Sequence, residues 1–307
     1  MAEISVSLQA EPRYLPSWLT LARRIEASGF EALLVGDHPG SGSSPWSALG
    51  SAAAVTERLR LGTYVSQAGV REPMHLAADA ASLDILAPGR VILGVGAGHT
   101  PREWADLGRD RPSPPERAGR LVEFIEALAP LLAGETVTLN GRFLSVHGAA
   151  LDELPVGRVA LTVGGGNPAI LQAGARRADV VALTGLGKTH PDGHRHDIRW
   201  SANLLHDQLE QVRRAAAQAD NDPELEVLVQ IVTATDDRPA AIAELVARDR
   251  GPTTEEVAGT PYALIGTPEQ MAAQLTSQAE RLGIRRYVVR EPAVPVLERV
   301  LVILSGK

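Results

Sequence analysis

The sequence contains no cysteine, and this one absence excludes several kinds of chemistry. Without thiols the chain forms no disulfide, offers no thiolate metal ligand and has no cysteine nucleophile. Aromatic residues are scarce at 4%, and basic residues are outnumbered, since 30 Lys and Arg stand against 37 Asp and Glu for a formal net charge of −7. Proteins that bind nucleic acids generally carry an excess of basic residues, so we expect no nucleic-acid partner.

Long apolar runs are also missing. No stretch approaches the roughly 20 residues needed to cross a bilayer, and Met1–Ala10 lacks the charged start and apolar run of a signal peptide. We therefore expect a cytoplasmic protein without membrane contact. The 307 residues, 44% of them hydrophobic, provide enough material for one large core. Because no linker or internal repeat divides the chain, we predict a single domain over residues 1–307.

Short apolar runs and helical periodicities alternate along the chain. Helix boundary signals accompany the helical stretches: Gly29 ends the first helix, and Thr267-Pro268-Glu269-Gln270 is a capping box. Eight strand–helix units predict a parallel sheet closed into a (β/α)8 TIM barrel, with an open doubly wound sheet as the alternative. The strands are expected at Ile4–Leu8, Ala32–Val35, Leu59–Val65, Val91–Val95, Val159–Val163, Val180–Thr184, Val227–Thr233 and Tyr287–Val289.

Some segments fall outside this repeating pattern. Two alternating runs within Thr136–Val146 flank Asn140-Gly141, a residue pair typical of a tight hairpin turn with positive φ angles. We predict a small hairpin inserted after the fourth strand–helix unit. The polar, proline-rich stretch His99–Pro115 is expected to be a loop, and Pro239–Thr260 is expected to begin as a helix and then become irregular.

The fourth predicted strand runs into Gly94, Gly96 and Gly98. A strand that ends in alternating glycines brings bare backbone close to a ligand or to another main chain, and the sequence leaves both possibilities open. The cluster Gly164–Gly166 precedes a residue pair, Asn167-Pro168, that suits a helix cap and first turn. The N–H groups of such a turn bind anions, although tight helix–strand packing alone also explains the glycines.

In a barrel the active site lies at the carboxyl ends of the strands. His38 is the best candidate for proton chemistry, because imidazole titrates near neutral pH, and Asp37 is placed to orient it. A solvated histidine before Pro39 is the alternative. This rule collects Asp37 and His38 and the segments Tyr64–Gln67, Gly94–His99, Gly164–Asn167 and Thr184–Lys188. The candidate site residues chosen from them are Asp37, His38, Tyr64, Val65, Ser66, Gly96, Gly98, His99, Gly164, Gly165, Gly166, Asn167, Thr184, Gly185, Leu186 and Gly187.

Two further motifs point to other chemistry. The segment Ala182–Thr189, ALTGLGKT, is similar to a nucleotide phosphate-binding loop, but it has alanine at the first glycine position and no helix directly after it. His190, His194 and His196 invite a metal site, but no carboxylate accompanies them in fixed register on a helix. We therefore expect a polar loop and no bound metal.

Five motifs in order carry a family resemblance. The chain from about residue 4 to 290 resembles the bacterial luciferase-like monooxygenase superfamily and, more narrowly, its branch that uses the deazaflavin coenzyme F420. The motifs are VGDHP (Val35–Pro39), LRLGTYV (Leu59–Val65), REP (Arg71–Pro73) followed by the helix and strand ending at Gly98, VGGGNP (Val163–Pro168) and IGTPEQM (Ile265–Met271).

The resemblance implies a barrel with the flavin or deazaflavin ring across the strand ends. His38 would lie against the reactive edge of the ring, and a cis non-prolyl peptide would follow the third strand, at Tyr64-Val65 or one bond later. The coenzyme phosphate would bind at Gly164–Gly166 and at Gly185–Gly187. On the neighbouring loop, Lys188 and Arg195 are candidates to neutralise the phosphate or the anionic tail, or are solvated side chains.

The resemblance further implies hydride transfer between coenzyme F420 and a small organic substrate, in a homodimer. A monooxygenase that uses flavin mononucleotide (FMN) is the alternative, and a non-catalytic barrel that has lost the coenzyme is a second one. His99 stands where some sugar-phosphate dehydrogenases of the family place an acidic residue. The proton donor is therefore left open among His38, His99 and Glu103.

Overall fold

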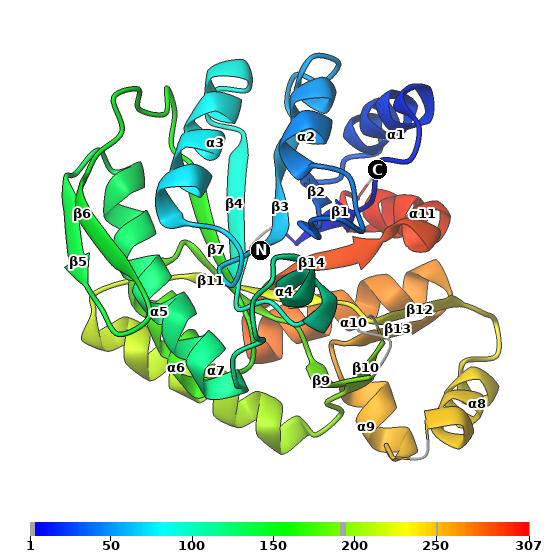
Figure 1. The fold of residues 1–307 in the computed structure, drawn as a ribbon. Helices are drawn as coiled ribbons and strands as arrows, with labels where there is room; N and C mark the ends of the chain where they lie inside the picture. Colours follow the sequence, from blue (N-terminus) through cyan, green and yellow to red (C-terminus); the bar gives the residue numbers. More distant parts are fainter. Residues whose placement is uncertain (1–3, 191–194, 250, 307) are drawn as a thin grey trace.

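A closed barrel of eight parallel strands forms the centre of the computed structural model, which describes residues 4–190, 195–249 and 251–306 (Figure 1). The order around the barrel is β1-β14-β11-β8-β7-β4-β3-β2. This confirms the predicted (β/α)8 fold and rules out the open sheet. The barrel strands are β1 (Ser5–Gln9), β2 (Ala32–Val35), β3 (Arg60–Gln67), β4 (Val91–Gly96), β7 (Ala160–Gly164), β8 (Val180–Leu183), β11 (Glu224–Leu228) and β14 (Ile284–Arg290).

Helices follow the strands and cover the outside of the barrel (Figure 1). Their ends carry the predicted caps: Thr267 and Gln270 form a capping box, and Gly283 ends the same helix at φ +75°. The covering helices are α1 (Leu15–Ala27), α2 (Pro45–Ala53), α3 (Pro73–Leu86), α5 (Pro114–Leu132), α6 (Pro168–Arg177), α7 (Ala202–Gln218), α10 (Pro268–Leu282) and, after the 3-10 turn η1 (Glu291–Ala293), α11 (Val294–Leu304).

Further elements are inserted between these units. One is the predicted hairpin, which lies beside α5 outside the barrel (Figure 1). The inserted elements are α4 (Pro101–Asp106), β5 (Val137–Asn140), β6 (Ser145–Ala149), β9 (Leu186–Thr189), β10 (His196–Ile198), β12 (Ile231–Ala234), α8 (Arg238–Asp249), α9 (Thr254–Gly259) and β13 (Ala263–Gly266).

The hairpin turn differs from the prediction. Neither Asn140 nor Gly141 has a positive φ angle, and the N–H of Gly141 donates to the carbonyl of Leu144, so the turn is longer than two residues. A Cβ on Gly141 would lie 2.3 Å from the Glu123 carboxylate and 2.9 Å from the backbone carbonyl oxygen of Leu144, so a larger residue there would force both to shift. That carboxylate accepts hydrogen bonds from the backbone of the turn at Arg142 and Phe143. The turn is therefore shaped by a helix side chain rather than by local φ preference.

The seventh barrel strand ends earlier in the sequence than the predicted Val227–Thr233. The barrel strand β11 ends at Leu228, and β12 leaves the barrel to pair in parallel with β13. The strand β13 was not predicted from the sequence. The segment Pro239–Thr260, expected to be irregular after its first helix, contains a second helix, α9, after α8. Buried side chains of these helices and strands, such as Ile242, Val257 and Ile265, form a small core separate from that of the barrel. This unit lies at the lower right in Figure 1.

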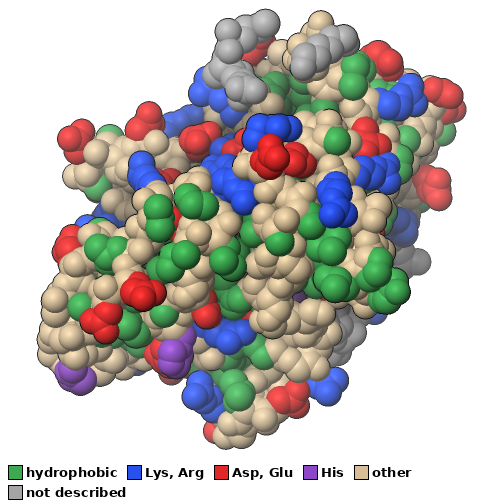
Figure 2. Space-filling model, turned by 90° about the horizontal axis from the view of Figure 1, so that it is seen from above, with side chains coloured by type: hydrophobic (Ala, Val, Ile, Leu, Met, Phe, Trp, Pro, Cys, Tyr) green, Lys and Arg blue, Asp and Glu red, His purple; other side chains and the backbone are tan. Residues whose placement is uncertain are grey.

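The surface in Figure 2 carries both signs of charge. Lys and Arg side chains alternate with Asp and Glu over that face, with hydrophobic side chains scattered between them (Figure 2). Within the described residues, none of the helices combines the length and apolar composition required to span a membrane.

The inner packing of the barrel depends on close contacts between β3 and β4. A Cβ atom on Gly62 would lie 2.1 Å from the carbonyl oxygen of Ile92, so only glycine fits. We expect Gly62→Ala to lower the free energy of unfolding by about 1–3 kcal/mol, because the strands must move apart. Urea denaturation followed by circular dichroism measures this change.

Gly259→Ala is the matched control, because a Cβ on Gly259 meets no atom within 4 Å. Its free energy of unfolding should stay within about 0.5 kcal/mol of the wild type. Equal stability of the two variants would contradict the close β3–β4 contact.

Candidate active site

A cavity of about 970 Å³ opens at the carboxyl ends of the barrel strands. Its volume is in the range of small-molecule and cofactor pockets. The structure therefore brings together, around one cavity, residues that are spread over most of the sequence. The predicted site residues that line it are Asp37, His38, Tyr64, Val65, Gly96, Gly98, His99, Gly164, Gly165, Thr184 and Leu186.

The other predicted residues do not line the cavity. Ser66 is fully buried, and its hydroxyl has no hydrogen-bond partner. Gly185 has φ +63° and packs on the Tyr262 ring, and Gly187 lies in β9 close to Asp197. Gly185 and Gly187 therefore contribute to the backbone conformation at the β9–β10 hairpin.

Gly166 and Asn167 lie at the amino end of α6. The Asn167 side chain accepts a hydrogen bond from the N–H of Ala169, which confirms it as the helix cap. The carbonyl of Gly166 accepts from the amide of Gln208. A Cβ on Gly166 would lie 3.9 Å from Nη1 of Arg199, so a guanidinium stands beside this turn.

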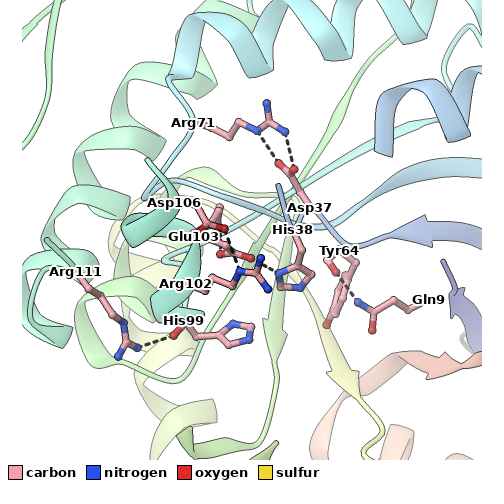
Figure 3. A network of polar contacts seen from close by, with 11 residues as sticks. Gln9, Asp37, His38, Tyr64, Arg71, His99, Arg102, Glu103, Asp106 and Arg111 are labelled. Atoms are coloured by element: carbon pink, nitrogen blue, oxygen red, sulfur yellow. Dashed lines mark hydrogen bonds and ion pairs between the residues drawn. The ribbon is translucent and has the colours of Figure 1, made fainter. Parts of the chain in front are cut away.

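His38 follows β2 and is paired with Glu103, which projects from α4 (Figure 3). Nδ1 of His38 lies 2.6 Å from Oε1 of Glu103, whose side chain is 3% exposed. The amide of Gln67, at the end of β3, donates to the other carboxylate oxygen. A carboxylate at Nδ1 favours the tautomer with the proton on Nδ1, which leaves Nε2 for proton exchange in the cavity.

The expected role of Asp37 in orienting His38 is wrong. Both oxygens of Asp37 accept from the guanidinium of Arg71, at 3.0 and 2.7 Å (Figure 3). Asp37 is only 1% exposed, and a buried carboxylate needs such a partner. The orienting carboxylate of His38 comes instead from Glu103, which sequence reasoning considered as a proton donor or as the start of a helix.

The pairing with Glu103 shifts the titration of His38. The hydrogen bond to Glu103 raises the pKa of His38 above 6.5, and burial of the ring opposes this rise. The negative charges of Glu103, Glu11 and Asp37 raise the pKa further. His38 therefore keeps its second proton to a higher pH than a free imidazole does.

The peptide bond between Tyr64 and Val65 is cis, as the family resemblance implied. The register of β3 against β4 shifts between Thr63 and Ser66, so the chain bulges there. A Cβ on Gly96 would come within 2.6 Å of the Val65 side chain, and a Cβ on Gly94 within 2.2 Å of the Thr63 carbonyl. Contacts with the neighbouring strand β3 therefore explain why β4 has glycines. The sequence had left open whether these glycines approach a ligand or another part of the chain.

Several polar atoms at the cavity wall have no partner. Within the described residues, the Tyr64 hydroxyl, Oε1 of Gln9 and Oε1 of Gln67 are buried without a hydrogen bond. All three residues line the cavity. Buried polar atoms are normally satisfied, so these atoms favour a polar ligand in the cavity.

Three histidine rings approach one another at the rim. The centroids of His38 and His99 are 5.6 Å apart, and those of His99 and His196 are 4.6 Å apart, both edge to face. In the described part of the chain no group of His, Asp or Glu side chains is arranged to hold a metal ion. His194 lies outside the described residues. Lys188 is exposed on β9, and Arg195 is exposed just before β10.

Sequence reasoning collected Gln67 at the end of the third strand but missed Gln9, Arg71 and Arg290 as residues of this site. Gln9 and Arg290 are the last residues of β1 and β14, and Gln67 is the last residue of β3. The strand-end rule was therefore the signal that could have found them. Arg71 belongs to the REP motif, but no local pattern identifies Asp37 as its partner, because only the tertiary structure brings the two together.

A closed (β/α)8 barrel with a histidine–carboxylate pair in a cavity at its carboxyl rim is the architecture of a barrel enzyme. The chain matches the model of the luciferase-like monooxygenase family over residues 1–260 and belongs to this family.

Named relatives come from two groups. The F420-dependent glucose-6-phosphate dehydrogenase of Beutenbergia cavernae is 37% identical over 191 residues, which are 59% of this chain and 55% of that protein. The 4-hydroxyprotoasukamycin monooxygenase of Streptomyces nodosus subsp. asukaensis is 37% identical over 142 residues, 45% of this chain and 38% of that protein. The chain thus spans about half the length, or less, of these curated relatives.

Solved structures share the fold over its whole length. An F420-dependent secondary alcohol dehydrogenase, solved with an F420-acetone adduct, matches with a TM-score of 0.76 and 18% identity, covering 99% of this chain and 98% of that one. The F420-dependent tetrahydromethanopterin reductase of Methanopyrus kandleri matches with a TM-score of 0.72 and 18% identity, covering 98% and 97%. Identities this low establish the barrel fold alone.

The Asp37–Arg71 pair is expected to contribute strongly to stability. We predict that Arg71→Met lowers the free energy of unfolding by about 3 kcal/mol, because it leaves the buried Asp37 carboxylate without its partner. Chemical denaturation of the variant measures the loss.

Arg102→Met is the control, because Arg102 and Asp106 form an exposed pair one helical turn apart. This variant should lose no more than about 0.5 kcal/mol. A loss at Arg71 as small as the loss at Arg102 would show that Asp37 is not held by the ion pair.

Proposed function

We propose that the chain is a coenzyme F420-dependent oxidoreductase that moves a hydride between the deazaflavin ring and a small organic substrate. One observation carries the proposal: the His38–Glu103 pair and the glycine turns at Gly96, Gly98 and Gly164 line a single cavity. The names of the relatives and of the structural neighbours support the choice of coenzyme. The open cavity argues against a barrel that has lost its ligand.

The residues of this chain fit such a coenzyme. The cavity volume, the unpartnered polar atoms of Gln9, Tyr64 and Gln67, and the cis bulge at Val65 are consistent with a flat ring lying on β3 and β4. When bound, the deazaflavin supplies a ring carbon that accepts or returns a hydride.

His38 holds the proton that accompanies the hydride. In the direction of alcohol oxidation, Nε2 of His38 takes the hydroxyl proton while the hydride leaves the neighbouring carbon, and a carbonyl group forms. In the direction of reduction, the imidazolium returns the proton to the carbonyl oxygen. Glu103 stabilises the imidazolium, since it is the charged hydrogen-bond partner of Nδ1.

The coenzyme phosphate is proposed to bind at the amino end of α6. Helix amino ends attract anions through free N–H groups and the helix dipole. The N–H of Gly165 already donates to the carbonyl of Ala182, so Gly166 is the better donor. Arg199 stands beside this turn and supplies the positive charge that was expected from Lys188 or Arg195.

A monooxygenase that uses FMN is the second candidate. The observation that favours it is the 37% identity to a named monooxygenase over 142 residues. Deazaflavins react poorly with oxygen, so the two candidates differ in their chemistry as well as in their coenzyme.

Coenzyme titration separates the two candidates. We expect the protein to quench the fluorescence of coenzyme F420 at lower concentrations than are needed for FMN. The deazaflavin riboside without phosphate is the control and should bind more weakly, because it does not engage the α6 turn. Binding of FMN alone would overturn the deazaflavin assignment.

The pairing of His38 with Glu103 predicts a specific pH dependence. In the wild type the imidazole should titrate above 6.5, and Glu103→Gln should lower this midpoint, because the variant removes the charged hydrogen-bond acceptor. NMR titration of labelled histidine measures both midpoints, with His38→Asn assigning the signal. Alcohol oxidation requires the neutral base, so its rate should rise with pH through the wild-type midpoint.

Asp106→Asn is the control for this titration. Asp106 lies on the same helix α4, but it is exposed and bonded to Arg102. Its loss should leave the His38 midpoint in place. An unchanged midpoint in Glu103→Gln would mean that the carboxylate does not control the histidine.

A further inference from the structure

A row of polar side chains follows the carboxyl rim of the barrel on the side of β1, β14 and β11. Gln9 faces Arg290 in the register of β1 and β14. Nη1 of Arg290 donates to Oε1 of Gln230 at 3.2 Å, and Nε2 of Gln230 donates to the carbonyl of Thr184 at 2.6 Å. Gln9, Thr184 and Arg290 line the cavity. The row therefore holds the Arg290 guanidinium at the cavity wall.

Among the described residues, Arg290 has a hydrogen-bond partner but no counterion. Arg24 pairs with Glu298, and Arg71 pairs with Asp37. Within the described residues, the bond to Gln230 is the hydrogen bond that Arg290 donates, and no carboxylate lies within ion-pair distance. A guanidinium has five N–H donors, so most of its donors remain for a ligand. Partial desolvation at the cavity wall lowers the pKa of Arg290, although its side chain stays exposed.

A second donor lies on the same cavity wall. The Tyr64 hydroxyl is buried without a partner, and burial raises its pKa well above 10, so it stays protonated. The positive charge of Arg290 acts on Tyr64 in the opposite direction, so the two groups are within electrostatic reach of each other. A guanidinium and a phenolic hydroxyl both seek hydrogen-bond acceptors. An oxyanion satisfies both.

We propose that Arg290, positioned by Gln230, binds an oxyanion of the substrate, either a carboxylate or a phosphate, while the reacting carbon faces the coenzyme and His38. The proposal rests on the proposed function and adds the substrate class: a small anionic organic molecule. Arginine binds both kinds of anion with two parallel hydrogen bonds. β11 and β14 are the seventh and eighth strands of the barrel, the position where barrel enzymes often bind phosphate groups.

Binding of small anions to the purified protein tests the proposal without a known substrate. Isothermal titration calorimetry in a Tris chloride buffer compares inorganic phosphate and acetate on the wild type and on Arg290→Gln. We expect one or both probes to bind the wild type and to bind the variant roughly tenfold or more weakly, because a charged hydrogen-bonding pair is lost. The stronger probe identifies the kind of oxyanion.

Arg13→Gln is the matched control. Arg13 also lines the cavity and is exposed, as Arg290 is, but it lies on the segment before α1 and has no partner comparable to Gln230 among the described residues. Its loss should leave anion binding unchanged. Arg290→Lys keeps the charge without the planar fork and should fall between the wild type and Arg290→Gln.

Four results would overturn the proposal: no binding of either probe to the wild type, equal binding to Arg290→Gln, a loss seen only in Arg13→Gln, or weaker binding of coenzyme F420 to Arg290→Gln with the small anions unaffected. The last result would assign Arg290 to the coenzyme. Failure of the wild type to bind coenzyme F420 while Arg290 still binds small anions would count against the proposed function alone.

Discussion

A carboxylate that is almost completely removed from water must have its oxygens bound, and Glu103 satisfies this requirement at the centre of the candidate site. One oxygen lies at His38 and the other accepts from Gln67. These two contacts tie α4 to the ends of β2 and β3. The orientation of the His38 ring, the rise in its pKa and the position of α4 all depend on this one buried carboxylate.

The second constraint is the close approach of β3 and β4. The Val65 side chain occupies the space that side chains on Gly94, Gly96 and Gly164 would otherwise fill. The Val65 side chain therefore packs directly against the backbone of these glycines at the bulge, beside the cavity that Val65, Gly96 and Gly164 line. These glycines are therefore required first for packing between strands. The surface that they leave at the cavity follows from that packing.

The charges at the rim are arranged in three separate ways. In the Asp37–Arg71 pair, both carboxylate oxygens of Asp37 accept hydrogen bonds from the guanidinium of Arg71. In the His38–Glu103 pair, Nδ1 of the imidazole is bound to the carboxylate, whereas Nε2 is not bound to Glu103. Within the described part of the chain, the side chain of Arg290 is held by a neutral amide, that of Gln230. The cavity thus has an imidazole paired with a carboxylate and a guanidinium for which no carboxylate partner occurs among the described residues, and the proposed anionic substrate rests on this combination.

By itself the sequence determined the barrel strands, the helix caps at Asn167 and Thr267, the inserted hairpin and the family. These features follow from short-range patterns of apolar residues, from cap residues and from motifs, all of which lie within a few neighbouring positions. Only the tertiary structure decided that Glu103, not Asp37, orients His38, that β12 pairs with β13, and that Gln9 stands beside Arg290. Each of these contacts joins residues about 30 to 280 positions apart. The reason is physical. The partner of a buried charge or of a strand edge depends on which distant segment the closed barrel brings next to it, and this cannot be deduced from neighbouring residues in the sequence.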